Sequence, residues 1–364
     1  RTAPVPERIH NQALSLTRVF LAVILAGDAA YTRGVKMEEA SMSHSTDTRR
    51  SASDRGMGWA LLGVTLALAI GPLWILGCGK KQEDKPTIAV IPKGTSQSFW
   101  LAVKAGAEKA GQELGVRIHW DGPAEETDLD GQIRIVQNAI TKKVTAIVLA
   151  ACDAKSLVRY VRDAQEAGIP VVTIDSGISP DISAAFLATD NVKGGAEAAD
   201  ALAALIGEKG KVGLLPFIKG AGSSDDRERG FCDALSKYPN IDLGDRILYS
   251  NSDVSIGLDK TKSMLTSTPD LAGIFAANQG GAEGAIQALR QMGKAGKVKL
   301  VCYDASDAEI QALRDGVAQA LIVQNPYRMG YEGVKTAMRV VQGENIDPRV
   351  IDTGVTKVTL ENLD

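Results

Sequence analysis

From residue 87 onward, the chain alternates short apolar runs rich in β-branched residues with longer stretches of helical pattern. Several helical stretches end in glycine, which commonly stops a helix. Continuous apolar strands separated by helices are typical of parallel sheets covered on both faces. Because roughly 280 residues exceed one hydrophobic core, the pattern predicts an α/β fold of two doubly wound parallel-sheet lobes. The expected strands cover residues 87–91, 116–120, 145–150, 170–174, 184–188, 211–217, 271–277, 297–303, 318–323 and 350–358.

The composition excludes several classes of function. The net charge of -3 argues against the basic surface that a nucleic-acid partner requires. The four cysteines show no CxxC spacing, which argues against a zinc site or a disulfide framework. His119 is the only histidine after residue 50, and no serine lies in a GxSxG context. We therefore expect no enzyme, metal site or cofactor, and we interpret Cys152, Cys232 and Cys302 as small buried residues.

An uncharged run from Trp59 to Gly77 ends directly before Cys78. Its last residues, ILGC, resemble the bacterial lipobox, in which an aliphatic residue lies three before the cysteine and a small residue just before it. The resemblance implies a signal peptide over residues 57–78 and a lipid anchor on Cys78 that holds the protein at the membrane. The alternative is an uncleaved membrane helix with an incidental cysteine. We interpret residues 1–56 as a disordered leader or a misassigned gene start, and residues 79–85 as a tether.

Polar or aromatic side chains follow the carboxyl ends of many predicted strands. In doubly wound sheets, ligands bind in the crevice beyond these ends. Each side chain alone could be a helix cap or a turn former. Together, the carboxylates and amides could bracket hydroxyl groups while an aromatic ring covers the C–H face of a sugar. We predict a site for a neutral polyhydroxyl ligand, formed by Lys93, Gln97, Phe99, Trp100, Asp175, Arg227, Asn278, Asp304 and Gln324.

The body of the chain resembles the periplasmic sugar-binding proteins of the ribose/galactose type, the receptors of ABC importers. The matching stretches are IAVIPKGTSQSFW, AGIPVVTIDSG, FLATDNVKGG, DDRERGF, LAGIFAANQGGAEGAIQAL, VKLVCYDAS and ALIVQNPYRMGYEGVKTA. The resemblance implies that two lobes close over a monosaccharide or related polyol. A monomer in the periplasm or cell envelope would then deliver the ligand to an ABC permease.

The same resemblance implies where the lobes begin and end. The N-terminal lobe would comprise residues 86–189 plus 325–352, and the C-terminal lobe residues 190–324 plus 353–364. Three chain crossings would join the lobes as a hinge, near Ala188–Asn191, Gln324–Pro326 and Asp352–Gly354.

Site roles follow from the resemblance as well. Phe99 and Trp100 match an aromatic pair of which one ring stacks on the sugar. Asp175 and Arg227 match a carboxylate and an arginine that bind the ligand. Asn278, Asp304 and Gln324 match an amide, a carboxylate and a second amide that the family has in the second lobe and hinge.

Several positions depart from the pattern of the ribose receptor. Ser176 stands where that receptor has an arginine, Gln97 where it has an asparagine, and Ser98 where it has a proline. Near Asp253, where the family often has another aromatic residue, this chain has none. Ribose itself is therefore not expected. Lys93 could bind the ligand, neutralise Asp175 or extend its ammonium to solvent.

Other motifs favour ordinary structural roles. The segment 220–224 is expected to be a plain loop between a strand and a helix and not a phosphate cradle. Asp128 is expected to cap a helix and not to belong to a calcium loop, while Glu125 and Glu126 are expected to be solvated. A sugar-responsive repressor would need a basic helix-turn-helix before the first strand, where the lipobox lies. A sensory receptor remains an alternative to a transport receptor, because in both cases a partner protein would recognise the closed lobes.

Overall fold

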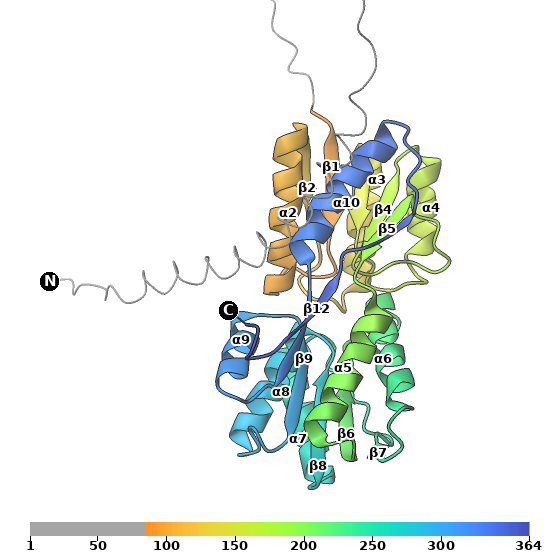
Figure 1. Cartoon of the computed structure of the whole chain (residues 1–364). Coiled ribbons are helices and arrows are strands. Elements are labelled where there is room, and N and C mark those ends of the chain that lie inside the picture. The colour runs from red at the N-terminus through yellow and green to blue at the C-terminus, as the bar shows by residue number, and fades with distance from the viewer. Residues whose placement is uncertain (1–84, 364) are drawn as a thin grey trace, which may run out of the picture. The chain divides into compact units, whose positions relative to one another are not determined.

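The computed structural model describes residues 85–363, which form two α/β lobes. Figure 1 shows one lobe above the other, each built on its own sheet. The predicted leader, signal peptide, Cys78 and almost all of the tether lie outside the described residues. No helix within residues 85–363 has the length and apolar character that crossing a membrane requires.

The first lobe contains a six-stranded sheet in which every neighbouring pair is parallel. Its order is β11 (Val350–Asp352), β5 (Ala185–Ala188), β4 (Val171–Ile174), β3 (Ala146–Leu149), β1 (Thr87–Ile91) and β2 (Arg117–Trp120).

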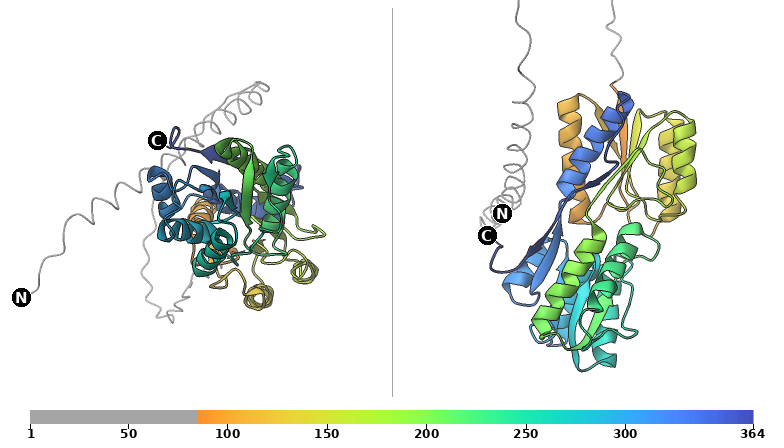
Figure 2. Two further views of the ribbon diagram at one scale, coloured as in Figure 1. Left: turned by 90° about the horizontal axis from the view of Figure 1, so that it is seen from below. Right: turned by 45° about the vertical axis from the view of Figure 1, so that its right-hand side comes forward.

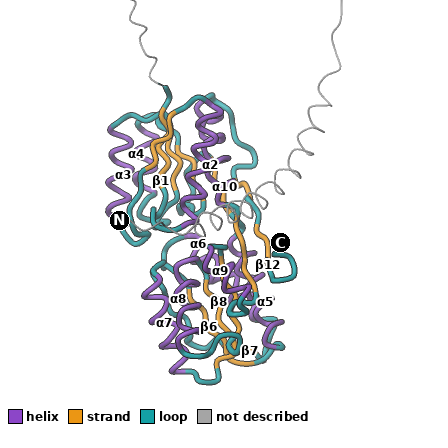
Figure 3. Tube along the Cα trace, turned by 90° about the vertical axis from the view of Figure 1, so that its left-hand side faces the viewer, coloured by secondary structure: helices purple, strands orange, loops and turns teal. Residues whose placement is uncertain are grey.

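Side chains along each strand alternate between the two faces of this sheet. In β1, Ile88 and Val90 join the core beneath α2 (Ser98–Leu114) and α10 (Pro326–Val341). Ala89 and Ile91 join the core beneath α3 (Leu129–Thr141) and α4 (Val158–Glu166). Figure 3 shows these helix pairs on opposite sides of β1. The uninterrupted apolar strands thus bury both faces, as their sequence predicts.

The second lobe repeats this arrangement with one reversed strand. The sheet order is β12 (Val355–Val358), β10 (Ala320–Gln324), β9 (Lys299–Tyr303), β8 (Leu271–Ala276), β6 (Gly210–Leu215) and β7 (Ile241–Asp242). Only β12 in this sheet is antiparallel to its neighbour. One face packs against α5 (Asn191–Ile206) and α6 (Gly222–Leu235), and the other against α7 (Val254–Ser267), α8 (Gln279–Gln291) and α9 (Asp307–Arg314).

Three segments carry the chain between the lobes: β5 to α5, β10 to α10 and β11 to β12. The right-hand view of Figure 2 shows β11 and β12, in dark blue, running from the upper lobe to the lower lobe. The predicted fold class with its three-crossing hinge is confirmed. The prediction of one strand over residues 350–358 is wrong. The chain breaks at Thr353 and Gly354, where glycine takes a φ of 89°, so that β11 and β12 join different sheets.

Glycines set how closely two helix pairs approach. A methyl group on Gly330 of α10 would lie 1.9 Å from the backbone oxygen of Val103 in α2, and one on Gly106 would lie 2.0 Å from that of Tyr327. In the other lobe, Gly195 of α5 and Gly230 of α6 likewise each lie against the backbone of the opposite helix. Any side chain at these positions would force the helices apart.

Candidate functional site

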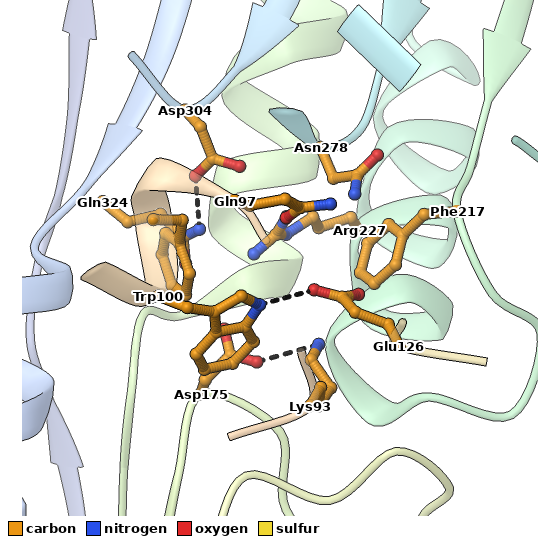
Figure 4. Close-up of a pocket in the computed structure, with 11 residues that line it drawn as sticks. Lys93, Gln97, Trp100, Glu126, Asp175, Phe217, Arg227, Asn278, Asp304 and Gln324 are labelled. Atoms are coloured by element: carbon orange, nitrogen blue, oxygen red, sulfur yellow. Dashed lines mark hydrogen bonds and ion pairs between the residues drawn. The ribbon is translucent and has the colours of Figure 1, made fainter. Parts of the chain in front are cut away.

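A pocket lies between the two lobes, at the carboxyl ends of both sheets. Figure 4 shows side chains from both lobes converging on it. Its lining includes every residue predicted for the ligand site, together with Glu126 and Phe217. The predicted set is therefore brought together around one cavity, and two members of the lining were not predicted.

Strand ends place the charged and amide groups at this junction. Asp175 directly follows β4, Asp304 directly follows β9, and Gln324 is the last residue of β10. The two aspartates have φ angles of 57° and 89°, a left-handed backbone that is uncommon for residues other than glycine. Such strained positions cluster at functional sites, where the surrounding structure holds them.

Lys93 and Asp175 form a buried ion pair, with 2.9 Å between Nζ and Oδ2 and only 2–3% of either side chain exposed. The ammonium also donates to the hydroxyls of Ser176 at 3.0 Å and of Ser223 in the second lobe at 3.1 Å. Three acceptors thus use its three N–H groups. Burial alone would lower the pKa of Lys93, but the Asp175 and Glu126 carboxylates outweigh burial and leave the pKa raised from its ordinary value.

Of the three roles considered for Lys93, this arrangement excludes extension to solvent and favours neutralisation of Asp175. Its ammonium does not reach solvent, and it lies against the Asp175 carboxylate. Lys93, two residues after the end of β1, thus supplies a positive charge beside Asp175. Mutual neutralisation allows both charges to be buried.

Arg227 extends from α6 into the centre of the junction and is 2% exposed. Its Nε donates to the side-chain oxygen of Asn191 at 2.9 Å, and Nη1 donates to the backbone oxygen of Ala277 at 2.7 Å. The guanidinium carbon lies 3.7 Å from the ring centre of Tyr303. These contacts hold the guanidinium plane in one orientation toward the pocket.

Asp304 and Gln324 form the polar wall contributed by β9 and β10. Gln324 Nε2 donates to Asp304 Oδ1 at 2.6 Å, and the backbone N–H of Gln279 donates to Oδ2 at 3.1 Å. Burial raises the pKa of Asp304, and the Arg227 guanidinium and these hydrogen bonds offset part of the effect. Within residues 85–363, the buried Oε1 of Gln324 has no hydrogen-bond partner, which leaves one acceptor in the pocket for a ligand hydroxyl.

The expectation that Glu126 is a solvated loop residue is wrong, although its neighbour Glu125 is exposed. Glu126 is 6% exposed and accepts hydrogen bonds from Trp100 Nε1 at 2.8 Å and from Ser252 Oγ at 2.7 Å. Its loop follows the carboxyl end of β2, so the rule that located the other residues also applies to this strand. Phe217 is not among the predicted site residues, because the expected strand 211–217 includes it as the last residue, whereas β6 ends at Leu215.

The other predicted motifs have structural roles. Asp128 caps α3 by accepting from the Gly131 N–H at 2.8 Å. Within residues 85–363, no group of three or more His, Cys, Asp or Glu residues is arranged to hold a metal ion. Cys152 and Cys302 are buried and Cys232 is half-buried. The segment 220–224 leads from β6 into α6, whose Ser223 hydroxyl accepts from Lys93 and lies 2.6 Å from the Ser176 hydroxyl.

Comparison with known proteins places this architecture in a family. The family model described as a periplasmic binding protein domain matches residues 88–345. The chain belongs to the periplasmic binding protein family. Its relatives include the D-ribose/D-allose-binding protein of Pseudomonas aeruginosa, which is 32% identical over 291 residues, covering 76% of this chain and 89% of that protein.

Two solved structures show the same fold. A carbohydrate transporter solute binding protein from Agrobacterium radiobacter, in complex with D-arabinose, is 38% identical with a TM-score of 0.74, covering 78% of this chain and 97% of that chain. An ABC transporter solute binding protein from Agrobacterium vitis, with bound D-fucose, is 38% identical with a TM-score of 0.74, covering 76% and 97%. The predicted ribose/galactose-type resemblance is confirmed, and the chain is a binding protein and not an enzyme.

Proposed function

We propose that this periplasmic binding protein captures a monosaccharide or related polyol between its lobes and delivers it to an ABC importer. The observation that carries the proposal is the composition of the pocket: carboxylates, amides, a guanidinium and aromatic rings from both lobes surround one small cavity. The named ligands of the relatives, D-ribose, D-allose, D-arabinose and D-fucose, support the same class. The nine predicted residues would act as the ligand-binding set.

The charge distribution favours a neutral ligand. Two cations, Lys93 and Arg227, and three carboxylates, Asp175, Asp304 and Glu126, line the pocket. All three N–H groups of Lys93 have acceptors in the protein, so an anionic ligand would not gain them without breaking the buried pair. A hydroxyl group, which can donate and accept, suits the open Oε1 of Gln324 and the carboxylates beside it.

An aromatic ring supplies an apolar surface within the pocket. Trp100, which is 1% exposed, would cover the apolar face of a sugar ring from the first lobe.

Lobe closure would couple ligand binding to transport. Several hydrogen bonds join the lobes beside the pocket: Gln97 Nε2 donates to the Ser252 carbonyl at 3.0 Å, and Ser98 Oγ donates to Gln279 Oε1 at 3.0 Å. A ligand that contacts both lobes favours the closed state, since its contacts are complete only there. The permease would then recognise the closed form, with the protein acting as a monomer in the periplasm or cell envelope.

Thermal unfolding with a ligand panel tests the proposal. At about 100 times the dissociation constant, a bound sugar should add about 2.7 kcal/mol to the free energy of unfolding. The panel would hold D-arabinose, D-fucose, D-ribose, D-allose and xylitol, with nucleosides and amino acids for contrast. Asp304→Ala should lose the response, whereas Asp307→Ala, an exposed aspartate on α9, should keep it. Stabilisation by nucleosides or amino acids alone would contradict the sugar assignment.

Anchoring through Cys78 is a separate part of the proposal. The lipobox-like ILGC sequence supports lipid attachment there. Incorporation of labelled palmitate by the full chain in a bacterial host, and its loss in Cys78→Ser, would be the expected result. Equal labelling of both proteins would refute a lipid on this cysteine.

A further inference from the structure

A chain of hydrogen bonds runs from the aromatic wall of the pocket across the junction of the lobes. Trp100 Nε1 donates to Glu126 Oε1 at 2.8 Å, and Ser252 Oγ donates to Glu126 Oε2 at 2.7 Å. Asn278 Nδ2 in turn donates to Ser252 Oγ at 2.6 Å. Trp100 and Glu126 belong to the first lobe, and Ser252 and Asn278 to the second. Figure 4 shows the Glu126 carboxylate beside the indole nitrogen of Trp100.

Among the carboxylates that line the pocket in the described part of the chain, residues 85–363, Glu126 alone accepts hydrogen bonds from both lobes. Each of its oxygens has one donor, and the side chain is 6% exposed. Hydrogen bonds to a carboxylate are stronger than those between neutral groups. A buried indole N–H left without an acceptor would carry the full cost of its desolvation. The carboxylate therefore fixes the plane of the indole as well as its position.

The partner in the second lobe is held in an unusual backbone conformation. Ser252 has a φ of 59° and its neighbour Asn251 a φ of 53°, both in the left-handed region. The carbonyl of Ser252 accepts from Gln97 Nε2 of the first lobe and packs against Gly280, where an added methyl group would lie 2.2 Å away. A costly conformation that is held by contacts on every side points to a functional role.

We propose that Glu126 is a positioning residue for ligand binding. Its bond to Trp100 orients the ring that covers the ligand, and its bond to Ser252 holds the lobes together while the ring is in place. This role rests on the proposed function. The two bonds are separable: the Trp100 bond lies within one lobe and persists when the lobes part, whereas the Ser252 bond exists only when they meet.

Three variants of the full chain test this assignment. Glu126→Ala removes both bonds and Ser252→Ala removes only the bond between the lobes. Glu126→Gln keeps an acceptor for the indole and can donate to the Ser252 hydroxyl. The probes are D-arabinose and D-fucose, with binding and release followed by stopped-flow fluorescence. A second measurement follows how strongly acrylamide quenches the fluorescence of Trp100 in the absence of sugar. The Trp100 signal is obtained by subtracting the emission of a Trp100→Phe protein.

The expected results separate the two bonds. Glu126→Ala should weaken binding at least about tenfold, chiefly through faster release, and should make Trp100 easier to quench without sugar. Ser252→Ala should speed release by a similar factor but leave the sugar-free quenching unchanged. Glu126→Gln should recover most of the affinity. A purely structural role would instead lower the melting temperature of the sugar-free protein with no change in quenching.

Two results would overturn the assignment. The first is a sugar affinity of the Ser252→Ala protein that lies within twofold of the wild-type affinity. This result can be obtained even if the Glu126 variants do not fold. The second is unchanged Trp100 quenching in a folded Glu126→Ala protein. If the wild type binds no sugar or polyol of the panel, the proposed function fails, yet the sugar-free quenching comparison still decides whether Glu126 positions the ring.

Discussion

The buried pair of Lys93 and Asp175 makes a quantitative prediction about stability. At the 2.9 Å separation of Nζ and Oδ2, Coulomb attraction is about 6 kcal/mol at an effective dielectric constant of ~20. Most of this attraction offsets the desolvation of two charges, so the pair adds little net stability over an apolar pair. Removing one partner, however, leaves the other buried and uncompensated, which costs roughly 3–5 kcal/mol.

Lys93→Met is the informative change, because methionine keeps the length of the side chain without the charge. We expect it to lower the free energy of unfolding by about 3 kcal/mol or more, measured by equilibrium urea denaturation. Asp175→Asn should also be destabilising, and the double variant should recover most of the loss, because it leaves no unpaired charge. Lys211→Met provides a matched control: the pair with Asp270 has the same 2.9 Å separation but is exposed, so stability should change little.

The double variant decides whether the reasoning holds. A double variant as unstable as Lys93→Met alone would show that packing or the serine contacts, and not charge compensation, account for the loss. If Lys93→Met lowers the free energy of unfolding no more than Lys211→Met does, the Lys93–Asp175 pair is not effectively buried in solution.

Two further changes test the packing and the electrostatics of the lobes. Gly330→Ala should destabilise the protein by roughly 1–3 kcal/mol in urea denaturation, because the methyl group would lie 1.9 Å from the Val103 carbonyl; the matched control Gly222→Ala, whose nearest neighbour is 3.7 Å away, should change stability little. Glu309→Gln should raise the free energy of unfolding at pH 7 and flatten its pH dependence. Burial, and then the charge of Asp304, raise the pKa of Glu309 well above its ordinary value. The folded protein therefore binds more protons, and wild-type stability should rise as the pH falls through the window between the unfolded and folded pKa values. Equal pH profiles for wild type and Glu309→Gln would refute this cause.

Much of the fold could be predicted from local sequence. The apolar runs mark strands buried on both faces, and the boundaries of β1 are as expected. The split between β11 and β12 could not be predicted by the same means. Both fall in one run rich in β-branched residues. The family resemblance led us to expect a crossing near Asp352–Gly354, but the local pattern does not show that the two halves join different sheets.

The site could be predicted where a strand end determines the position of a side chain. Asp175, Asp304 and Gln324 belong to this class. The contacts of Glu126 depend on residues 26 and 126 positions away, Trp100 and Ser252. No local pattern reports such contacts, and adjacent acidic residues in a loop are usually solvated.

Predicting the role of Lys93 required knowing what lies opposite it. Its acceptors come from two segments far apart in the chain: Asp175 and Ser176 directly follow β4, and Ser223 lies in the first turn of α6 in the second lobe. The sequence showed only that the expected arginine is absent at Ser176. Where the compensating charge comes from is a property of the assembled junction.

A crystal structure of the protein with D-arabinose or D-fucose is the most direct test of the central claim. The account predicts sugar density between the lobes, with Trp100 against the ring and hydroxyl groups within hydrogen-bond distance of Asp304 and of the open Oε1 of Gln324. Density for a tightly bound sugar that contacts only one lobe, or that lies away from these residues, would contradict it.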